Sequence, residues 1–150
     1  MTSKPLGDNK VMQVGMIVEN IEAAVQAWSR LLGVEPPPIT ITDSFDISNA
    51  HYQGKPTQAQ AKLAFFDLGQ VTLELIKPIG EPSTWNDQLV AHGSSLHHIA
   101  FEIKGMEEHL RGLAEHELPL IQRGEYHGGR YAYVDGQQQF GTVIELLEND

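Results

Sequence analysis

Apolar residues recur along this chain with two different periods, which alternate and so predict the order of its elements. Residues 21–32 have helical spacing, with Asn20 placed to cap the start of the helix and Gly33 placed to end it. Residues 106–116 form a second helical stretch, and a shorter helix is expected to end near residue 92. Strands are expected at residues 11–18, 39–41, 62–68, 71–77, 94–103, 118–123, 131–135 and 142–147.

The order strand, helix, three strands occurs twice, and the two copies also match residue by residue. Aligning His98 with Gln13 matches the polar and apolar classes of most of the residues that follow, without gaps. A second alignment lays Glu145 on Glu74, each a single glutamate within an aliphatic strand. The predicted organisation is therefore an α+β chain with a disordered arm (1–10), a first βαβββ module (11–80), a linker helix (81–95) and a second βαβββ module (96–150).

The repeat places Gln13, Glu74, His98 and Glu145 at equivalent positions of equivalent strands. A lone strand glutamate or histidine usually faces solvent, but these two glutamates lie among aliphatic residues, where an unpaired carboxylate costs several kcal/mol. Two such carboxylates indicate a cation, and this mixture of nitrogen and oxygen ligands suits a divalent ion such as Zn, Co, Ni or Mn. His97 points to the opposite face of a regular strand, so we interpret it as structural.

The composition of the chain limits the kinds of molecule that it is expected to bind. The 20 acidic residues against 10 basic ones give a formal net charge of −10, which disfavours nucleic acid and favours a small-molecule substrate. Cysteine is absent from the sequence, so any metal must be held by His, Glu, Asp or Gln. We expect no membrane association, since no apolar run approaches about 20 residues, and the polar N-terminus suggests a cytoplasmic protein.

The polar stretch 42–60 is long enough to be either a lid or a disordered loop, and both interpretations stay open. Phe45 and Tyr52 within it are candidates for closing over a substrate. His127, which precedes a glycine pair, and Arg130, which could meet a negatively charged substrate, are two further substrate-binding candidates.

Three motifs resemble the vicinal oxygen chelate superfamily, which includes glyoxalases, bleomycin resistance proteins and dioxygenases. The motifs are LAFFDLGQVTLELIKPIG at 63–80, LHHIAFE at 96–102 and GTVIELLE at 141–148, and they are most similar to those of methylmalonyl-CoA epimerases. The resemblance implies two βαβββ modules that form a curved, open mixed sheet around a metal site. It also implies that Gln13, Glu74, His98 and Glu145 are the metal ligands.

The ligand set resembles a different branch of the superfamily. Epimerases carry a histidine where this chain has Gln13, whereas Gln, Glu, His and Glu are the ligands of glyoxalase I. The arginine with which glyoxalase I binds the glutathione carboxylate would fall at Ile17, so that likeness is also incomplete.

The activity expected from the resemblance is that of a metal-dependent epimerase or isomerase. It would abstract a proton alpha to a carbonyl through a metal-chelated enediolate, with Glu74 and Glu145 alternating as base and acid, on substrates of the methylmalonyl-CoA class. One alternative is the isomerisation of a hemithioacetal, as in glyoxalase I (lactoylglutathione lyase), and another is a non-catalytic resistance-type protein that binds a small molecule. A dioxygenase is disfavoured because its iron triad would need a histidine in place of Gln13. Exposed sheet edges in such a fold predict a homodimer.

Overall fold

The computed structural model describes residues 5–150. Of the expected disordered arm at 1–10, residues 1–4 lie outside this range, and Leu6 packs against the core of the second half. The first half contains β1 (Gln13–Ile17), α1 (Ile21–Leu32), β2 (Thr40–Ile41), α2 (Phe45–Ser48), β3 (His51–Tyr52), β4 (Lys55–Pro56), β5 (Gln60–Asp67) and β6 (Thr72–Ile79). The second half contains α3 (Thr84–His92), β7 (Ser95–Glu102), α4 (Met106–Glu115), β8 (Leu120–Tyr126), β9 (Gly129–Val134), α5 (Gln137–Phe140) and β10 (Val143–Asn149).

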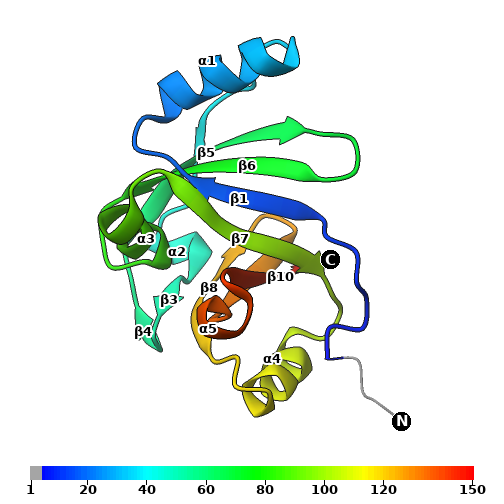
Figure 1. Cartoon of the computed structure of the whole chain (residues 1–150). Helices are drawn as coiled ribbons and strands as arrows, with labels where there is room; N and C mark the ends of the chain where they lie inside the picture. The colour runs from blue at the N-terminus through cyan, green and yellow to red at the C-terminus, as the bar shows by residue number, and fades with distance from the viewer. Residues whose placement is uncertain (1–4) are drawn as a thin grey trace.

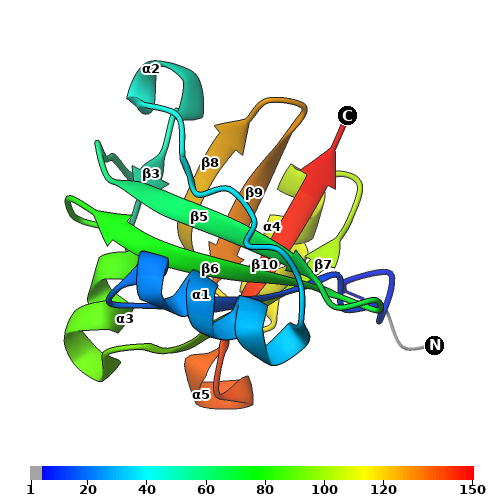
Figure 2. The same cartoon turned by 90° about the horizontal axis from the view of Figure 1, so that it is seen from above.

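All the strands join in one mixed sheet with the order β2-β5-β6-β1-β7-β10-β9-β8-β3-β4. The sheet curls, so that in Figure 2 β5 and β6 run across the direction of β8 and β9. Helices α1 and α4 lie at opposite ends of the molecule, outside the curve (Figure 1). The predicted α+β class and curved mixed sheet are confirmed. Among residues 5–150, no helix combines the length and apolar character needed to cross a bilayer.

Strand alternation separates the aliphatic residues from the two glutamates. Leu73 and Leu75 of β6 face the convex side, where they pack with residues of α1, and Glu74 between them faces the concave side. In β10, Leu146 packs on the convex side in the cluster that contains α4, while Glu145 faces the concave side. Helix packing on the outer face therefore turns each glutamate toward the interior of the curve.

The halves meet at β1 and β7, which pair antiparallel with a two-fold symmetric register. Gln13 lies opposite Ala100, and Gly15 lies opposite His98, which is the same pair with the two strands exchanged. The parallel neighbours follow the same symmetry, because Glu74 is paired with Gly15 and Glu145 with Ala100. This pairing supports the internal duplication, while the boundaries of the two modules stay a prediction.

The stretch 42–60 is ordered, which rules out the disordered interpretation. It contains α2 and the β3–β4 pair, and β3 extends the sheet of the second half by pairing His51 with Arg123 and Tyr52 with Gln122. Thr57 also donates a hydrogen bond to the carbonyl of Pro82 at 2.8 Å. A segment of the first half therefore covers one side of the second half.

Gly15 is required by the close approach of the His98 ring. A Cβ atom at this position would overlap the imidazole, whereas a Cβ atom at Gly112 in α4 would meet nothing within 4 Å. We predict that Gly15→Ala lowers the free energy of unfolding by about 1–3 kcal/mol, because the buried ring must shift. The matched Gly112→Ala variant should leave stability unchanged or raise it by up to about 1 kcal/mol through helix propensity. Urea unfolding of both variants checks this, and equal stabilities would contradict it.

Candidate metal centre

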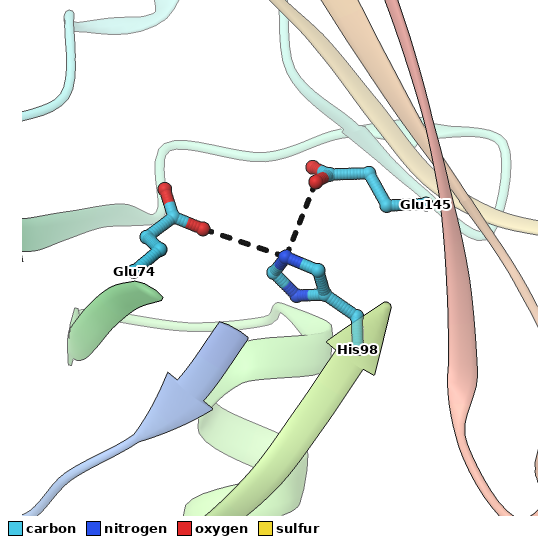
Figure 3. Close-up of side chains that lie close together, drawn as sticks. All are labelled: Glu74, His98 and Glu145. Atoms are coloured by element: carbon cyan, nitrogen blue, oxygen red, sulfur yellow. Dashed lines mark ion pairs between the residues drawn. The ribbon is translucent and has the colours of Figure 1, made fainter. Parts of the chain in front are cut away.

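Four side chains from four neighbouring strands converge on the concave face of the sheet. Gln13 projects from β1, Glu74 from β6, His98 from β7 and Glu145 from β10. Figure 3 shows the two carboxylates on different sides of the His98 ring, both directed at Nε2. The predicted ligands are therefore brought together, and their role as ligands is taken up as a proposal below.

The donor atoms have the spacing of a metal site. His98 Nε2 lies 3.1 Å from Glu145 Oε1, 3.5 Å from Glu74 Oε1 and 3.0 Å from the Gln13 amide. Ligand atoms bound to one divalent ion at about 2.1 Å are about 3 to 3.5 Å apart. The residues therefore fit a divalent metal without moving far.

The Gln13 amide can serve the centre in two orientations. With its NH₂ group turned inward, it donates to Glu145 Oε1 at 2.9 Å and to Glu74 Oε1 at 3.3 Å. With the amide turned over, its oxygen faces the same point and offers a ligand atom. A single rotation of the side chain would thus exchange two hydrogen bonds for one metal bond.

Burial makes the charge of this group costly. Glu74 is 8% exposed, Glu145 4% and His98 0%. Burial, and secondarily the charge of Glu145, raises the pKa of Glu74 above its ordinary value. Burial by itself lowers the pKa of His98, but the carboxylates of Glu145 and Glu74 outweigh it, and the pKa is raised. The metal-free centre therefore holds protons, and a bound metal would displace them.

His97 lies on the same side of the sheet as His98, contrary to the prediction that it points to the opposite face, and it contacts the Nδ1 edge of the His98 ring. The β1–β7 register shifts so that Gly15 pairs with His98 and Met16 with Leu96, which leaves His97 as the extra residue of a β-bulge. A bulge interrupts the alternation of side chains. As a result, His97 Nδ1 lies 2.8 Å from His98 Nδ1, and both rings pack against Tyr133.

This contact determines which nitrogen of His98 is available. If Nε2 of His98 binds a metal, the ring proton sits on Nδ1 and is donated to His97 Nδ1. His97 can accept it because burial, and then the charge of His98, lowers the pKa of His97 well below its usual value and keeps the ring neutral. Nε2 of His97 is buried and has no hydrogen-bond partner among the described residues.

A cavity of about 490 Å³ opens above the centre, within the size range of small-ligand sites. Its floor is formed by Gln13, Glu74 and Glu145. Its walls are mainly apolar and aromatic, with a few polar residues, and comprise Ile41, Thr42, Asp43, Ser48, Ala50, Ala59, Leu63, Phe65, Trp85, Glu125, Tyr126, Tyr131, Tyr133, Leu147 and Asn149.

The four substrate-binding candidates do not line this cavity. Phe45 packs against the ring of His51, and Tyr52 donates a hydrogen bond to Asp87. His127 is exposed in the turn between β8 and β9. Arg130 lies in an adjacent polar recess. The segment that carries Phe45 does reach the cavity, but through other residues.

Sequence reasoning missed the residues that support and enclose the centre. The roles of Gly15 and His97 depend on how β1 and β7 pair, and the residues around each of them in the sequence do not indicate this register. Trp85 lies in a helix with weak amphipathic character. Tyr131 and Tyr133 could have been predicted to act together, because two tyrosines separated by one residue in a strand lie on the same face of the sheet.

The family profile for the Glyoxalase/Bleomycin resistance protein/Dioxygenase superfamily matches residues 12–134, and the chain belongs to this superfamily. This confirms the family indicated by the three sequence motifs. The chain is also 27% identical over 143 residues to the uncharacterized protein YqjC of Bacillus subtilis (strain 168), which covers 93% of this chain and 92% of the relative.

Solved structures share the fold over nearly the whole chain. The hypothetical protein BH1468 from Bacillus halodurans C-125 has a TM-score of 0.66 at 22% identity, covering 94% of each chain. Methylmalonyl-CoA epimerase from Mycobacterium tuberculosis has a TM-score of 0.64 at 18% identity, covering 100% of this chain and 93% of the epimerase. At such low identity, these structures show the fold alone.

Metal binding should compete with protons at this centre. The pKa values of Glu74 and His98 are raised in the folded protein, so the folded state binds these protons more tightly than the unfolded chain does. Metal-free stability should therefore fall as the pH rises from the ordinary glutamate pKa through the raised values. Metal affinity should increase by up to about tenfold per pH unit for each proton displaced. Calorimetric titration with Zn²⁺ from about pH 6 to pH 8 measures this, and a pH-independent affinity would contradict it.

His97 should control metal affinity without binding the metal. His97→Phe keeps a ring against Tyr133 but removes the acceptor for His98 Nδ1, so we expect Zn²⁺ affinity to fall by about 10- to 100-fold. His97→Asn, which can place an oxygen near the Nδ1 position, should retain more of the affinity. Calorimetry gives both values, and thermal unfolding of the metal-free variants controls for folding. Wild-type affinity in a folded His97→Phe protein would show that His97 serves packing only.

Proposed function

We propose that this protein is a metal-dependent epimerase or isomerase that removes a proton from the carbon next to a carbonyl group and returns it. The supporting observation is the pair of buried carboxylates, Glu74 and Glu145, which reach one cavity floor from different strands and different halves of the chain (Figure 3). A reaction that takes a proton from one side and returns it on another needs two such groups.

The residues of the centre then have separate tasks. Gln13 and His98 would hold the metal together with both glutamates, and His97 would fix the His98 tautomer. When bound, a divalent metal would stabilise negative charge that develops on the oxygen atoms of the substrate. Glu74 and Glu145 would take and return the substrate proton, and a bound metal would favour the ionised carboxylate that a base needs.

The fold relatives support an acyl thioester as one substrate class. They include a methylmalonyl-CoA epimerase from Streptomyces coelicolor in complex with 2-nitronate-propionyl-CoA, which has a TM-score of 0.62 at 16% identity. For glyoxalase I activity, Gln13 is the favourable observation. Ile17 weakens that alternative, because it is fully buried in the core and leaves no cation there for a glutathione carboxylate.

A binding protein without catalysis is the alternative from another class. It predicts that the purified chain is metal-free and that Glu74→Gln with Glu145→Gln leaves ligand binding intact. The spacing of the donor atoms and the burial of both carboxylates favour the metal-dependent enzyme.

A cytoplasmic location and a homodimer are further parts of the proposal. The sheet ends at β2 and β4, and each of these edge strands is two residues long. Because β2 pairs with only two residues of β5, residues 64–67 of β5 have no strand on their outer edge among the described residues. This open edge could pair with a second copy of the chain.

Proton exchange tests the proposed chemistry directly. Metal-loaded protein in D₂O should exchange the alpha proton of at least one member of a panel of 2-methyl acyl thioesters, α-hydroxyketones and hemithioacetals, followed by NMR. Glu74→Gln and Glu145→Gln should each slow the exchange by about 10²- to 10⁴-fold. Glu115→Gln, which changes an exposed glutamate on α4 outside the cavity, is the matched control and should keep the full rate. Metal-loaded wild-type protein that exchanges no member of the panel would refute the proposal.

A further inference from the structure

The cavity presents negative charge to a ligand. Its lining includes Asp43 and Glu125, both exposed, in addition to Glu74 and Glu145 on the floor. Among the described residues, no lysine or arginine lines it. A divalent metal would offset the two carboxylates of the floor, but the charges of Asp43 and Glu125 would still face whatever enters.

The nearest guanidinium groups are already paired. Arg123 and Arg130 line the adjacent recess together with Glu125. Arg123 forms an ion pair with Glu107 at 2.5 Å, and Arg130 forms pairs with Glu148 at 2.9 Å and Asp150 at 2.5 Å. Two arginines and one glutamate line this recess, and a phosphate group would have to displace the carboxylates with which the arginines are paired.

Lys62 on β5 is no better placed to meet a phosphate group. Lys62 pairs with Glu22 of α1 at 3.2 Å, and α1 packs on the convex side of the sheet, away from the cavity. The phosphates of a coenzyme A thioester would thus find no free cation in the wall of the cavity or in the recess beside it.

Aromatic rings form the inner wall of the cavity, and two of their hydroxyl oxygens accept hydrogen bonds from neighbouring side chains. The rings of Trp85 and Tyr131 lie 6.3 Å apart, and those of Tyr131 and Tyr133 lie 5.1 Å apart. The hydroxyl of Tyr133 accepts a hydrogen bond from Trp85 Nε1, and that of Tyr131 accepts one from Gln122 Nε2, both at 3.0 Å. Trp85 is only 5% exposed and Tyr133 2%, so the half-buried Tyr131 offers most of the ring surface that a ligand could contact.

The outer part of the cavity is apolar as well. Ile41 is 58% exposed and Phe65 43% exposed, both within the lining. Large exposed apolar residues at a cavity mouth are typical of a surface that is covered by a ligand.

We propose that the substrate is an aromatic α-hydroxyketone without an anionic group, rather than a phosphate-bearing thioester. This inference rests on the proposed function and specifies its substrate class. The hydroxyl and carbonyl oxygens would point to the floor, and the aromatic body would lie against Tyr131 and Phe65. One glutamate starts ionised and the other protonated. The ionised glutamate takes the proton from the hydroxyl-bearing carbon, the C–H electron pair forms a C=C bond, and the carbonyl π pair moves onto the carbonyl oxygen. The protonated glutamate then gives its own proton to the opposite face of the same carbon and the carbonyl re-forms, which inverts the carbon without any oxidant or co-reactant.

Three hydroxamates with the same chelating group test the charge preference. Benzohydroxamate, its 4-carboxylate and its 4-trimethylammonium derivative are titrated into Zn²⁺-loaded protein by calorimetry. The uncharged probe should bind at least about tenfold more tightly than the carboxylate, because Asp43 and Glu125 repel the added charge. The double variant Asp43→Asn/Glu125→Gln should reduce this ratio to about threefold or less. The control Glu35→Gln/Glu115→Gln removes two exposed charges outside the cavity and should keep the ratio.

The outcomes separate this inference from the proposed function. A carboxylate probe that binds as tightly as the uncharged one overturns the inference, even if proton exchange is observed with a thioester. Failure of all three probes to bind Zn²⁺-loaded protein overturns it as well. A clear preference for the uncharged probe supports it, and absence of proton exchange in the same protein would then refute only the enzymatic activity.

Discussion

The buried carboxylates of Glu74 and Glu145 are the constraint on which the architecture of this protein depends. Each is nearly inaccessible to water, and both lie within 3.5 Å of a single imidazole nitrogen. Two like charges in such a place are tolerated only if protons or a cation neutralise them. The curled sheet holds them there, because it brings β6 and β10, which lie on opposite sides of the β1–β7 pair, to one concave floor.

Much of this could be predicted from the sequence, because the signals were local or repeated. Helix α1 occupies residues 21–32 as expected, with Asn20 accepting a hydrogen bond from the Ala23 amide and Gly33 in the left-handed conformation. Asn20 and Gly33 act within one helical turn, so no distant contact could override them. The repeat then supplied long-range information, since aligning Gln13 with His98 and Glu74 with Glu145 identified four residues that do converge.

The remaining features depend on contacts between segments far apart in the chain. The orientation of His97 is set by a bulge, and the bulge exists only because β7 pairs with β1 in a shifted register. The stretch 42–60 lacks a regular pattern because its short elements are stabilised by pairing with β8 rather than by their own propensity. The cavity wall, to which that stretch contributes, was therefore not predictable from local sequence.

Departures from the internal symmetry give the two glutamates different surroundings. An exact duplication would place two equivalent carboxylates around a two-fold axis. The other pair of equivalent positions, however, holds two different side chains, His98 and Gln13. The cavity wall also differs between the halves, because Phe65 lies next to Glu74 in the sheet whereas Tyr133 lies next to Glu145. The duplication thus accounts for the presence of two buried carboxylates, and the departures from symmetry give each carboxylate its own neighbours.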